Sequence, residues 1–204
     1  NEQRMIEHCK AVAGIMPIIG FYLQPAVGGV LLPYHFWRSF AEIDNVLGIK
    51  VAPFNRYYTL DVVRATGETD KNITLYTGND DNIIMDLLTP YHIHTTKGKK
   101  ELRLVGGLLG HWGFWTRKAV ELLEEIHKLI NSGKDIPQRY FTLASQITDA
   151  NAAVFDPAHN FAGVIPGIHE ILRRQGLLEG RYCLDPDKDL SPDQKEEIDR
   201  VYLA

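Results

Sequence analysis

The sequence predicts a parallel α/β fold, and two observations carry this prediction. Four short apolar segments recur along the first half of the 204-residue chain, and segments with helical character separate them. None of the four alternates cleanly between apolar and polar residues, which is typical of strands that are covered on both faces. They begin 26 to 31 residues apart. A strand and then a helix, repeated at that interval, indicates a parallel sheet.

The predicted strands and the helices between them are short. The strands are "IIGFYL" (18–23), "LGIKVA" (47–52), "ITLYTG" (73–78) and "LVGGLLG" (104–110). A predicted helix over 33–43 begins with a proline, which suits a first helical turn. Two further predicted helices, 59–66 and 82–89, begin with Thr59 and Asn82, which are both acceptable N-caps.

The pattern changes in the second half of the chain. A long helix over 116–133 has apolar residues at helical spacing and stops at Gly133. Three more helices are predicted after it, with no strand between them: 140–155, 163–178 and 191–204. We therefore expect a βα region over residues 1–133 and a helical extension over 134–204. Four βα units fit either a small open sheet that is complete in itself or part of a closed (β/α)₈ barrel, which needs eight units.

Composition points to a globular protein of the cytoplasm. The chain is 45% hydrophobic and 24% charged, its formal net charge is −4, and it has two cysteines. No apolar run approaches the ~20 residues of a membrane span, and the polar start resembles no signal peptide. The acidic balance argues against a nucleic-acid partner. The basic residues Lys97, Lys99, Lys100 and Arg103 lie in a polar stretch that we predict to be a solvated loop.

Functional groups in both candidate folds lie at the carboxyl ends of the strands, and Lys50 is the most informative residue there. It stands between Ile49 and Val51 in the apolar run "VLGIKVAP" (46–53). Desolvation disfavours the charged form of an amine, and a neutral lysine can attack a carbonyl and form a Schiff base. The alternative is a lysine that extends out of an edge strand with its stem on apolar surface.

Other strand ends carry further candidates. Tyr22 can act as a proton donor or acceptor, or can simply pack in the core. The carboxylates of Asp80 and Asp81 suit a hydroxyl-rich ligand or a metal, although carboxylates before a helix more often serve as caps. His111 either lines the mouth of the sheet or packs there. The glycines near it, including Gly110, would let the backbone approach a ligand closely.

A metal site is not expected. His92 and His94 have an i, i+2 spacing that could serve a metal ion, but no third ligand lies near them in the sequence.

The quoted segments resemble the dihydrodipicolinate synthase and N-acetylneuraminate lyase family. "VLGIKVAP" resembles the strand that carries the family's Schiff-base lysine, which corresponds to Lys50. "FYLQPAVGG" (21–29) is similar to the family's Y-N-x-P-x-x-x-G strand, with Tyr22, Pro25 and Gly29 at matching positions. "LYTGNDD" (75–81) and "GGLLGHWG" (106–113) resemble the two following strand ends more loosely.

The resemblance implies a fold and a chemistry. The fold would be strands five to eight of a TIM-type (β/α)₈ barrel with a C-terminal helical extension, so we expect a fragment of a longer protein that is inactive alone. The activity would be that of a class I lyase or dehydratase acting on pyruvate or a related 2-keto acid. Lys50 would form the imine, and Tyr22 would relay the proton. No metal or organic cofactor is implied, and family members are usually homotetramers, so a homo-oligomer (dimer or tetramer) is expected.

The pocket and the exact reaction are less closely defined by the resemblance. We expect Gly78, Asn79, Asp80, Gly110 and His111 to bind the substrate. Val27 replaces the arginine that dihydrodipicolinate synthases carry two residues after the proline, and Leu23 replaces the usual asparagine. These departures argue against dihydrodipicolinate formation itself. An alternative hypothesis is a barrel paralogue that has lost catalysis and serves a binding or regulatory role.

Overall fold

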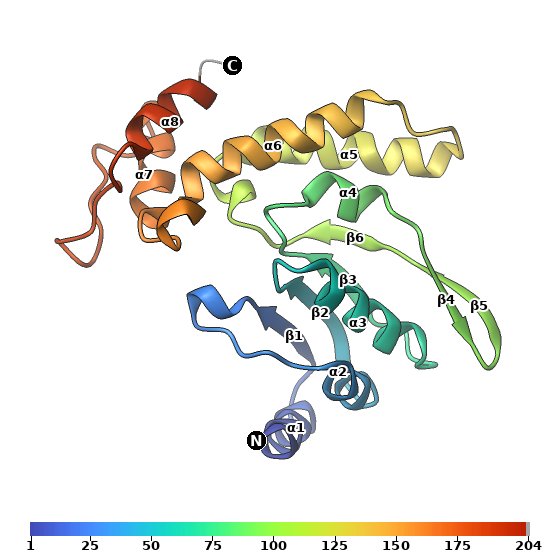
Figure 1. Ribbon diagram of the computed structural model, residues 1–204. Helices are drawn as coiled ribbons and strands as arrows, with labels where there is room; N and C mark the ends of the chain where they lie inside the picture. Colours follow the sequence, from blue (N-terminus) through green and yellow to red (C-terminus); the bar gives the residue numbers. More distant parts are fainter. Residues whose placement is uncertain (203–204) are drawn as a thin grey trace. The chain divides into compact units, whose positions relative to one another are not determined.

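The computed structural model describes residues 1–202, which form two compact units (Figure 1). The first unit contains residues 1–79 and 85–109, and the second contains 80–84 and the chain from residue 110 onward. The division expected after residue 133 falls inside the second unit. Helix α5 (Thr116–Ser132) is joined there to the helix that follows it, because the Tyr140 hydroxyl donates a hydrogen bond of 2.5 Å to Glu125.

The first unit is built on a parallel sheet of four strands. These are β1 (Ile18–Leu23), β2 (Val46–Ala52), β3 (Thr74–Thr77) and β6 (Leu104–Gly107), in the spatial order β1-β2-β3-β6. All three pairings are parallel. The four predicted strands and their parallel arrangement are therefore confirmed, with the last one ending at Gly107 rather than at residue 110.

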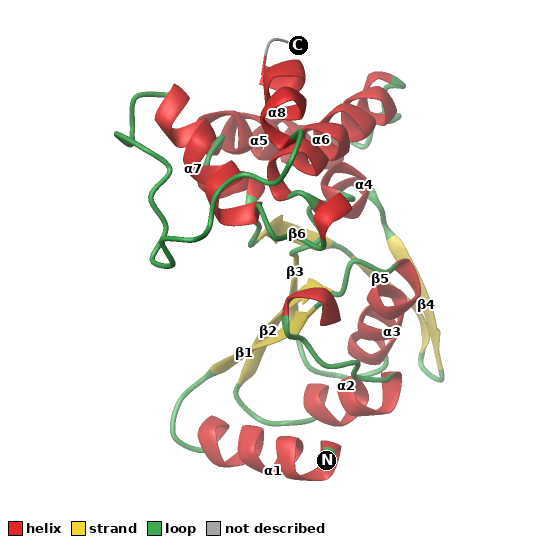
Figure 2. Cartoon of the chain, turned by 60° about the vertical axis from the view of Figure 1, so that its left-hand side comes forward, coloured by secondary structure: helices red, strands yellow, loops and turns green. Residues whose placement is uncertain are grey.

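Helices α1 (Glu2–Ala13), α2 (Tyr34–Ala41) and α3 (Arg56–Gly67) accompany this sheet (Figure 2). A short 3₁₀ turn, η1 (Pro25–Val27), follows β1. Helix α3 begins earlier than the sequence predicts, because Asn55 is its N-cap and accepts hydrogen bonds from the two backbone N–H groups of Tyr57 and Tyr58. Thr59, the predicted cap, is instead a buried residue inside the helix.

The two faces of the sheet differ in their surroundings. One face packs against α2 and α3, and its side chains form the buried core with residues of those helices, including Tyr22, Ile49, Val51, Leu75, Trp37, Phe40 and Val62. Because side chains alternate along a strand, the residues between them in sequence point to the opposite face. Ile19 and Phe21 lie on that second face and are exposed.

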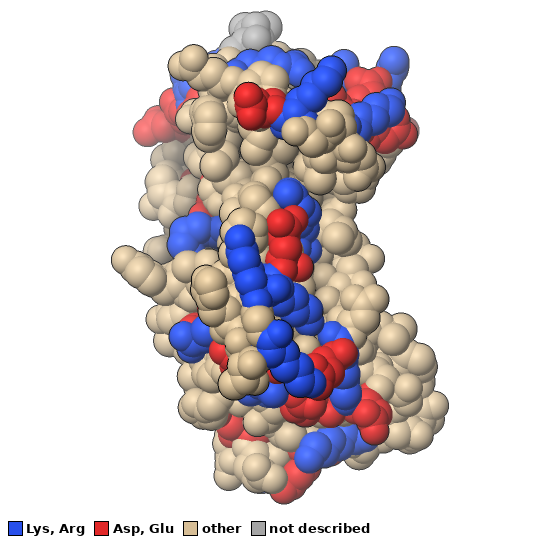
Figure 3. Space-filling view, turned by 90° about the vertical axis from the view of Figure 1, so that its right-hand side faces the viewer, with Lys and Arg blue, Asp and Glu red and all other residues tan. Residues whose placement is uncertain are grey.

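The stretch around residues 91–102 departs from its prediction. Strands β4 (Tyr91–Thr95) and β5 (Gly98–Leu102) pair as an antiparallel hairpin, where a solvated loop was expected. Gly98 has a φ of 118°, a conformation that glycine adopts readily and that closes the turn. Two lysines of this stretch have partners nearby: Lys97 pairs with Asp70 at 2.5 Å, and Lys100 donates a hydrogen bond of 3.1 Å to the Thr69 carbonyl. Basic and acidic side chains are correspondingly intermixed on the face shown in Figure 3.

The second unit is helical. It contains α5, α6 (Arg139–Phe155), α7 (Val164–Arg174) and α8 (Gln194–Tyr202), with the 3₁₀ turns η2 (His111–Gly113) and η3 (Pro157–His159). Helix α4 (Ile83–Leu88) begins in this unit and ends in the first. The core consists of Phe114, Ala153, Val154, Phe155, Ile171 and Ile198. The predicted helices are confirmed, but α7 ends at Arg174 rather than at residue 178 and α8 begins at Gln194 rather than at residue 191. Residues 203 and 204 lie outside the described part of the chain.

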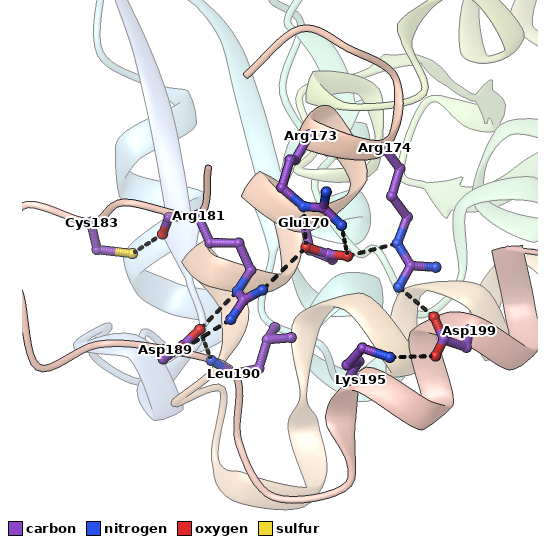
Figure 4. Close-up of polar contacts among 9 residues, drawn as sticks. All are labelled: Glu170, Arg173, Arg174, Arg181, Cys183, Asp189, Leu190, Lys195 and Asp199. Carbon is purple, nitrogen blue, oxygen red and sulfur yellow. Dashed lines mark hydrogen bonds and ion pairs between the residues drawn. The ribbon is translucent and has the colours of Figure 1, made fainter. Parts of the chain in front are cut away.

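Near the C-terminal end of α7, the buried carboxylate of Glu170 is paired with several arginines. The Glu170 side chain is 1% exposed, and Arg173 donates two hydrogen bonds to it, at 2.9 and 2.8 Å (Figure 4). Arg174 donates a third at 2.8 Å, and Arg181 lies 3.5 Å away. These guanidinium groups, with the Arg173 hydrogen bonds as the largest cause, lower the pKa of Glu170 to about 2. The cluster is a structural ion-pair network that ties α7 to the segment before α8.

No helix within residues 1–202 is both long enough and apolar enough to cross a membrane. The same residues contain no group of three or more His, Cys, Asp or Glu side chains arranged to hold a metal ion. His92 pairs instead with Glu101 across the hairpin at 3.2 Å.

Candidate active site

Lys50 lies on the sheet face that the helices do not cover, close to the carboxyl end of β2. Its register partners are Phe21 on β1 and Tyr76 on β3, so both aromatic residues share its face. The ammonium nitrogen lies 4.2 Å from the centroid of the Phe21 ring, which is within the range of a cation–π interaction. Lys50 is half-buried, while its chain neighbours Ile49 and Val51 are fully buried on the other face.

Gly78 lies directly beside the lysine stem. A Cβ atom at Gly78 would stand 2.8 Å from Cε of Lys50 and 2.6 Å from Cβ of Ala52. Both distances are shorter than a van der Waals contact allows, so a side chain at this position would collide with the stem and with the strand. The structure thus brings Gly78 and Lys50 together, and the absence of a side chain at Gly78 gives the lysine its room.

Tyr22, the predicted proton relay, is not the register partner of Lys50. It pairs in register with Val51, one residue further along, and therefore points to the helix-covered face. The residue is 1% exposed and packs on Trp37 and Tyr58. Its hydroxyl accepts a hydrogen bond of 3.2 Å from the backbone N–H of Leu32, and burial raises its pKa. These contacts fix the ring of Tyr22 in place, and its role in proton transfer remains a prediction.

Asn79 supports the turn that follows the lysine strand. It is 0% exposed, and its side-chain oxygen accepts a hydrogen bond of 3.0 Å from the backbone N–H of Phe54. Phe54 has a φ of 52°, a left-handed conformation that is unfavourable for a phenylalanine and persists only where neighbours fix it. Asn79 thus positions the β2–α3 turn, and the substrate contact expected of it remains a prediction.

The same network continues to a buried carboxylate, Asp86. Asp86 accepts hydrogen bonds from the Asn79 amide at 3.0 Å and from the Thr77 hydroxyl at 2.6 Å. It also pairs with Arg56. The Asp86 side chain is fully buried, so each of these donors compensates for lost solvation. Through them one carboxylate links the end of β3 to the start of α3.

The remaining predicted residues meet in the second unit. The backbone N–H of His111 donates a hydrogen bond of 2.9 Å to the Asp80 carboxylate. Gly110 lies beside them, and a Cβ there would stand 2.9 Å from the Phe155 ring. The structure therefore groups Asp80, Gly110 and His111, as their common assignment predicted, although their ligand remains a prediction.

Asn151 fixes the protonation pattern of His111. Its side-chain amide donates a hydrogen bond of 2.7 Å to the Asp80 carbonyl, so its oxygen faces Nδ1 of His111, 2.6 Å away. That oxygen can only accept, which places the imidazole proton on Nδ1. His111 is 6% exposed, and this burial lowers its pKa, with the Asn151 hydrogen bond as a smaller opposing effect. The ring is thus a neutral imidazole held in one orientation.

Several residues of these clusters did not emerge from the sequence, including Asp86 beside Asn79. Phe21 and Tyr76 flank Lys50, and Asn151 holds His111 from a helix 40 residues away. Phe21 and Tyr76 could have been found only from the pairing of the strands, because they are the register partners of Lys50 on β1 and β3. Nothing in the sequence pattern marks Asn151.

No protein-family model matches the chain. Among curated proteins, the 4-hydroxy-tetrahydrodipicolinate synthase of Brachyspira hyodysenteriae is 32% identical over 100 residues. That match covers 48% of this chain and 31% of the relative, so it reaches about a third of the relative's length.

Solved structures match over the whole chain. The dihydrodipicolinate synthase of Bacteroides thetaiotaomicron has a TM-score of 0.69 at 14% identity, and this chain covers 61% of it. The enzyme of Acinetobacter baumannii, in complex with pyruvate, has a TM-score of 0.70 at 18% identity and 60% coverage. A prophage protein of the same family from E. coli K12, also with pyruvate, has a TM-score of 0.70 at 16% identity and 63% coverage.

These likenesses agree with the architecture described above. The parallel sheet with its helices corresponds to strands five to eight of the (β/α)₈ barrel of those structures, followed by a helical extension. The chain spans about three fifths of their length. Its resemblance to the dihydrodipicolinate synthase family, predicted from four short motifs, is thus confirmed in sequence and in fold.

Proposed function

We propose that the protein is a Schiff-base-forming lyase or dehydratase that acts on pyruvate or a related 2-keto acid through Lys50. The observation that carries the proposal is the setting of this lysine. It lies near the carboxyl end of a parallel strand, on the face that holds Phe21 and Tyr76, with its stem against Gly78. Active groups of such sheets occupy these strand ends. Two of the similar structures contain pyruvate, which supports the substrate class.

The chemistry requires only the amine, the substrate and water. The neutral Nζ of Lys50 forms a bond to the keto carbon, and the keto oxygen takes up two protons and leaves as water. One of these protons comes from the amine and the other from solution, so the product is a protonated imine. Its positive nitrogen accepts the electron pair of a C–C or C–H bond at the neighbouring carbon, which makes that bond breakable without an added cofactor.

The proton relay that the family resemblance implies for Tyr22 stays part of the proposal. Because Tyr22 pairs in register with Val51 and packs on Trp37, Lys50 and not Tyr22 carries the proposal. Gly78 leaves room for the lysine, and Asn79 fixes the turn behind it. Val27 and Leu23 stand where dihydrodipicolinate synthases carry other residues, so a keto-acid reaction other than dihydrodipicolinate formation is proposed. Homo-oligomerisation and a cytoplasmic location remain predictions from the sequence.

Borohydride trapping tests the proposal. The full-length protein is incubated with pyruvate, or with sugar-derived 2-keto acids, and reduced with borohydride, and the adduct is located by peptide mass spectrometry. We expect the adduct on Lys50 and its loss in Lys50→Met, while Lys71→Met, which removes a lysine that pairs with Asp44, retains it. No adduct on Lys50 with any of these keto acids would contradict the proposal and favour the non-catalytic paralogue.

A further inference from the structure

We propose that Phe21 is a second functional residue of the lysine site, whose ring holds the cationic nitrogen of Lys50 and stabilises the protonated imine formed there. This inference rests on the proposed function and deepens it. Phe21 begins the segment 21–29 but is not one of its matched positions, Tyr22, Pro25 and Gly29. It precedes Tyr22 in sequence and is the register partner of Lys50.

The geometry supports a built contact rather than a chance approach. Phe21 and Lys50 are register partners on adjacent parallel strands, so their side chains leave the sheet side by side. Nζ lies 4.2 Å from the ring centroid, well inside the limit of about 6 Å for a cation–π interaction. Gly78 constrains the lysine stem from the β3 side. The ring is 49% exposed, so it belongs to the open face and not to the packed core.

The ring distinguishes charge states of the nitrogen. An aromatic face attracts a cation and gives a neutral amine no comparable gain. The protonated form of Lys50 and the protonated imine are both cations at the same atom, whereas the attacking amine is neutral. The ring therefore stabilises both ends of the overall step, in which an ammonium and a ketone give a protonated imine and water. When the starting state is the neutral amine, however, the ring stabilises only the product and therefore favours the imine.

This reasoning predicts two changes when the ring is removed. Phe21→Leu lowers the pKa of Lys50, because it destabilises the cation, so more of the amine is neutral at a given pH. It also weakens the protonated imine relative to that neutral amine. At a pH below the pKa of the amine, the larger neutral fraction and the weaker imine offset each other, so the amount of imine is unchanged. At a pH above this pKa the amine is already neutral, so the variant forms less imine. The pH dependence, and not the activity alone, therefore reports the ring.

Other groups around the lysine need to be controlled. On its face, β1 contributes the non-titratable Ile19 and Phe21, and β3 contributes the phenol of Tyr76 in register with Lys50. The titratable Tyr58 and Asp61 of α3 lie near Tyr22, on the other face. The measurement is therefore repeated in a Tyr76→Phe background, which removes the phenol as a source of any shift.

The first experiment uses no keto acid. The full-length protein is labelled with acetic anhydride, which reacts with neutral amines, and modification of Lys50 is followed by mass spectrometry as a function of pH. We expect the midpoint to fall by roughly half a pH unit in Phe21→Leu. It should stay close to the wild-type value in Phe21→Trp, which keeps an aromatic face. Ile19→Ala, an exposed apolar change on the same face, should leave it unchanged.

The second experiment adds pyruvate and a low borohydride concentration. Above the amine midpoint, the initial rate of adduct formation should fall roughly two- to fivefold in Phe21→Leu and should be restored in Phe21→Trp. Below the midpoint the rates should agree.

The two experiments fail differently. An unchanged labelling midpoint in Phe21→Leu overturns the role of Phe21, whether or not an imine forms. A shifted midpoint without any adduct in the wild-type protein overturns the proposed function, and with it the stabilisation of an imine by Phe21. A loss of adduct that is equal at every pH also contradicts the inference, because that result indicates only altered packing.

Discussion

The backbone of Gly78 lies so close to the Lys50 side chain that a single additional carbon at Gly78 would collide with it. A Cβ on Gly78 would stand 2.8 Å from the lysine Cε and 2.6 Å from the Ala52 Cβ. The first collision involves a flexible stem that can move, but the second involves a short side chain fixed on β2. Because a displaced stem would also leave the Phe21 ring, this close approach links the backbone of β3 to the position of the candidate nucleophile.

Gly78→Ala should therefore reduce imine formation on Lys50 even in protein that remains folded. We expect an overpacking cost of about 1–3 kcal/mol in the free energy of unfolding and a clear loss of borohydride-trapped adduct on Lys50 in protein that remains folded. Gly113→Ala is the matched control, since a Cβ there meets nothing within 4 Å. Equal adduct yields in the two variants would show that Gly78 does not set the lysine position.

Asp86→Asn should destabilise the first unit. Thr77 and Asn79 donate to one carboxylate oxygen and Arg56 donates to the other, so an amide that keeps the first two bonds turns its N–H₂ group towards the Arg56 guanidinium, which loses its acceptor. A buried donor left without its acceptor costs about 1–3 kcal/mol, and urea denaturation measures this loss. Asp61→Asn removes a carboxylate paired with Arg64 at 3.4 Å on the surface of α3 and should cost no more than about 0.5 kcal/mol. A similar cost for both variants would refute the role of the network.

Glu170 should make the stability of the second unit depend on acid pH. Its pKa is lowered from 4.5 to about 2, chiefly by the Arg173 hydrogen bonds. A lowered carboxylate pKa contributes stability above the unfolded value, and this stability is lost as the pH falls from about 4.5 towards about 2. The contribution is roughly 3 kcal/mol at neutral pH.

Unfolding free energies measured between pH 2 and pH 6 test this linkage. Glu170→Gln should be destabilised at pH 6 and should show a smaller dependence of the unfolding free energy on pH in this window than the wild-type protein, because the contribution of Glu170 is removed while those of other carboxylates remain. Glu121→Gln, which removes a more exposed carboxylate on α5, should keep the dependence of the wild-type protein. A wild-type slope retained in Glu170→Gln would assign the acid transition to other carboxylates.

His111 should titrate below the ordinary histidine pKa of 6.5, because burial disfavours its charged form. For this histidine, stability is fully present above 6.5 and declines as the pH falls below that value towards the folded pKa. NMR of the imidazole nitrogens should show the proton on Nδ1. Asn151→Asp places a carboxylate against Nδ1 and should raise the pKa. A proton on Nε2, or no response to Asn151→Asp, would contradict the hydrogen-bond assignment.

The sequence by itself determined the strands, their parallel arrangement and the neighbourhood of the lysine. Buried strands need continuous apolar runs, and the helices that cover them need apolar residues at helical spacing, so both can be recognised from local sequence. The motif around Lys50 and the glycine of "LYTG" likewise pointed to residues that the fold brings together. The hairpin at 91–102 was missed because its polar residues resemble a solvated loop when their cross-strand partners are unknown.

Only the tertiary structure decided which side chains share a face. A shift of one residue in a strand moves a side chain to the other face of the sheet. Motif similarity pointed to Tyr22, and the register shows that Phe21 is the partner of Lys50 while Tyr22 packs against Trp37. The catalytic role of Tyr22 remains a prediction. The sequence contains both aromatic residues side by side, and the hydrogen-bonded pairing of two strands determines which one the lysine meets.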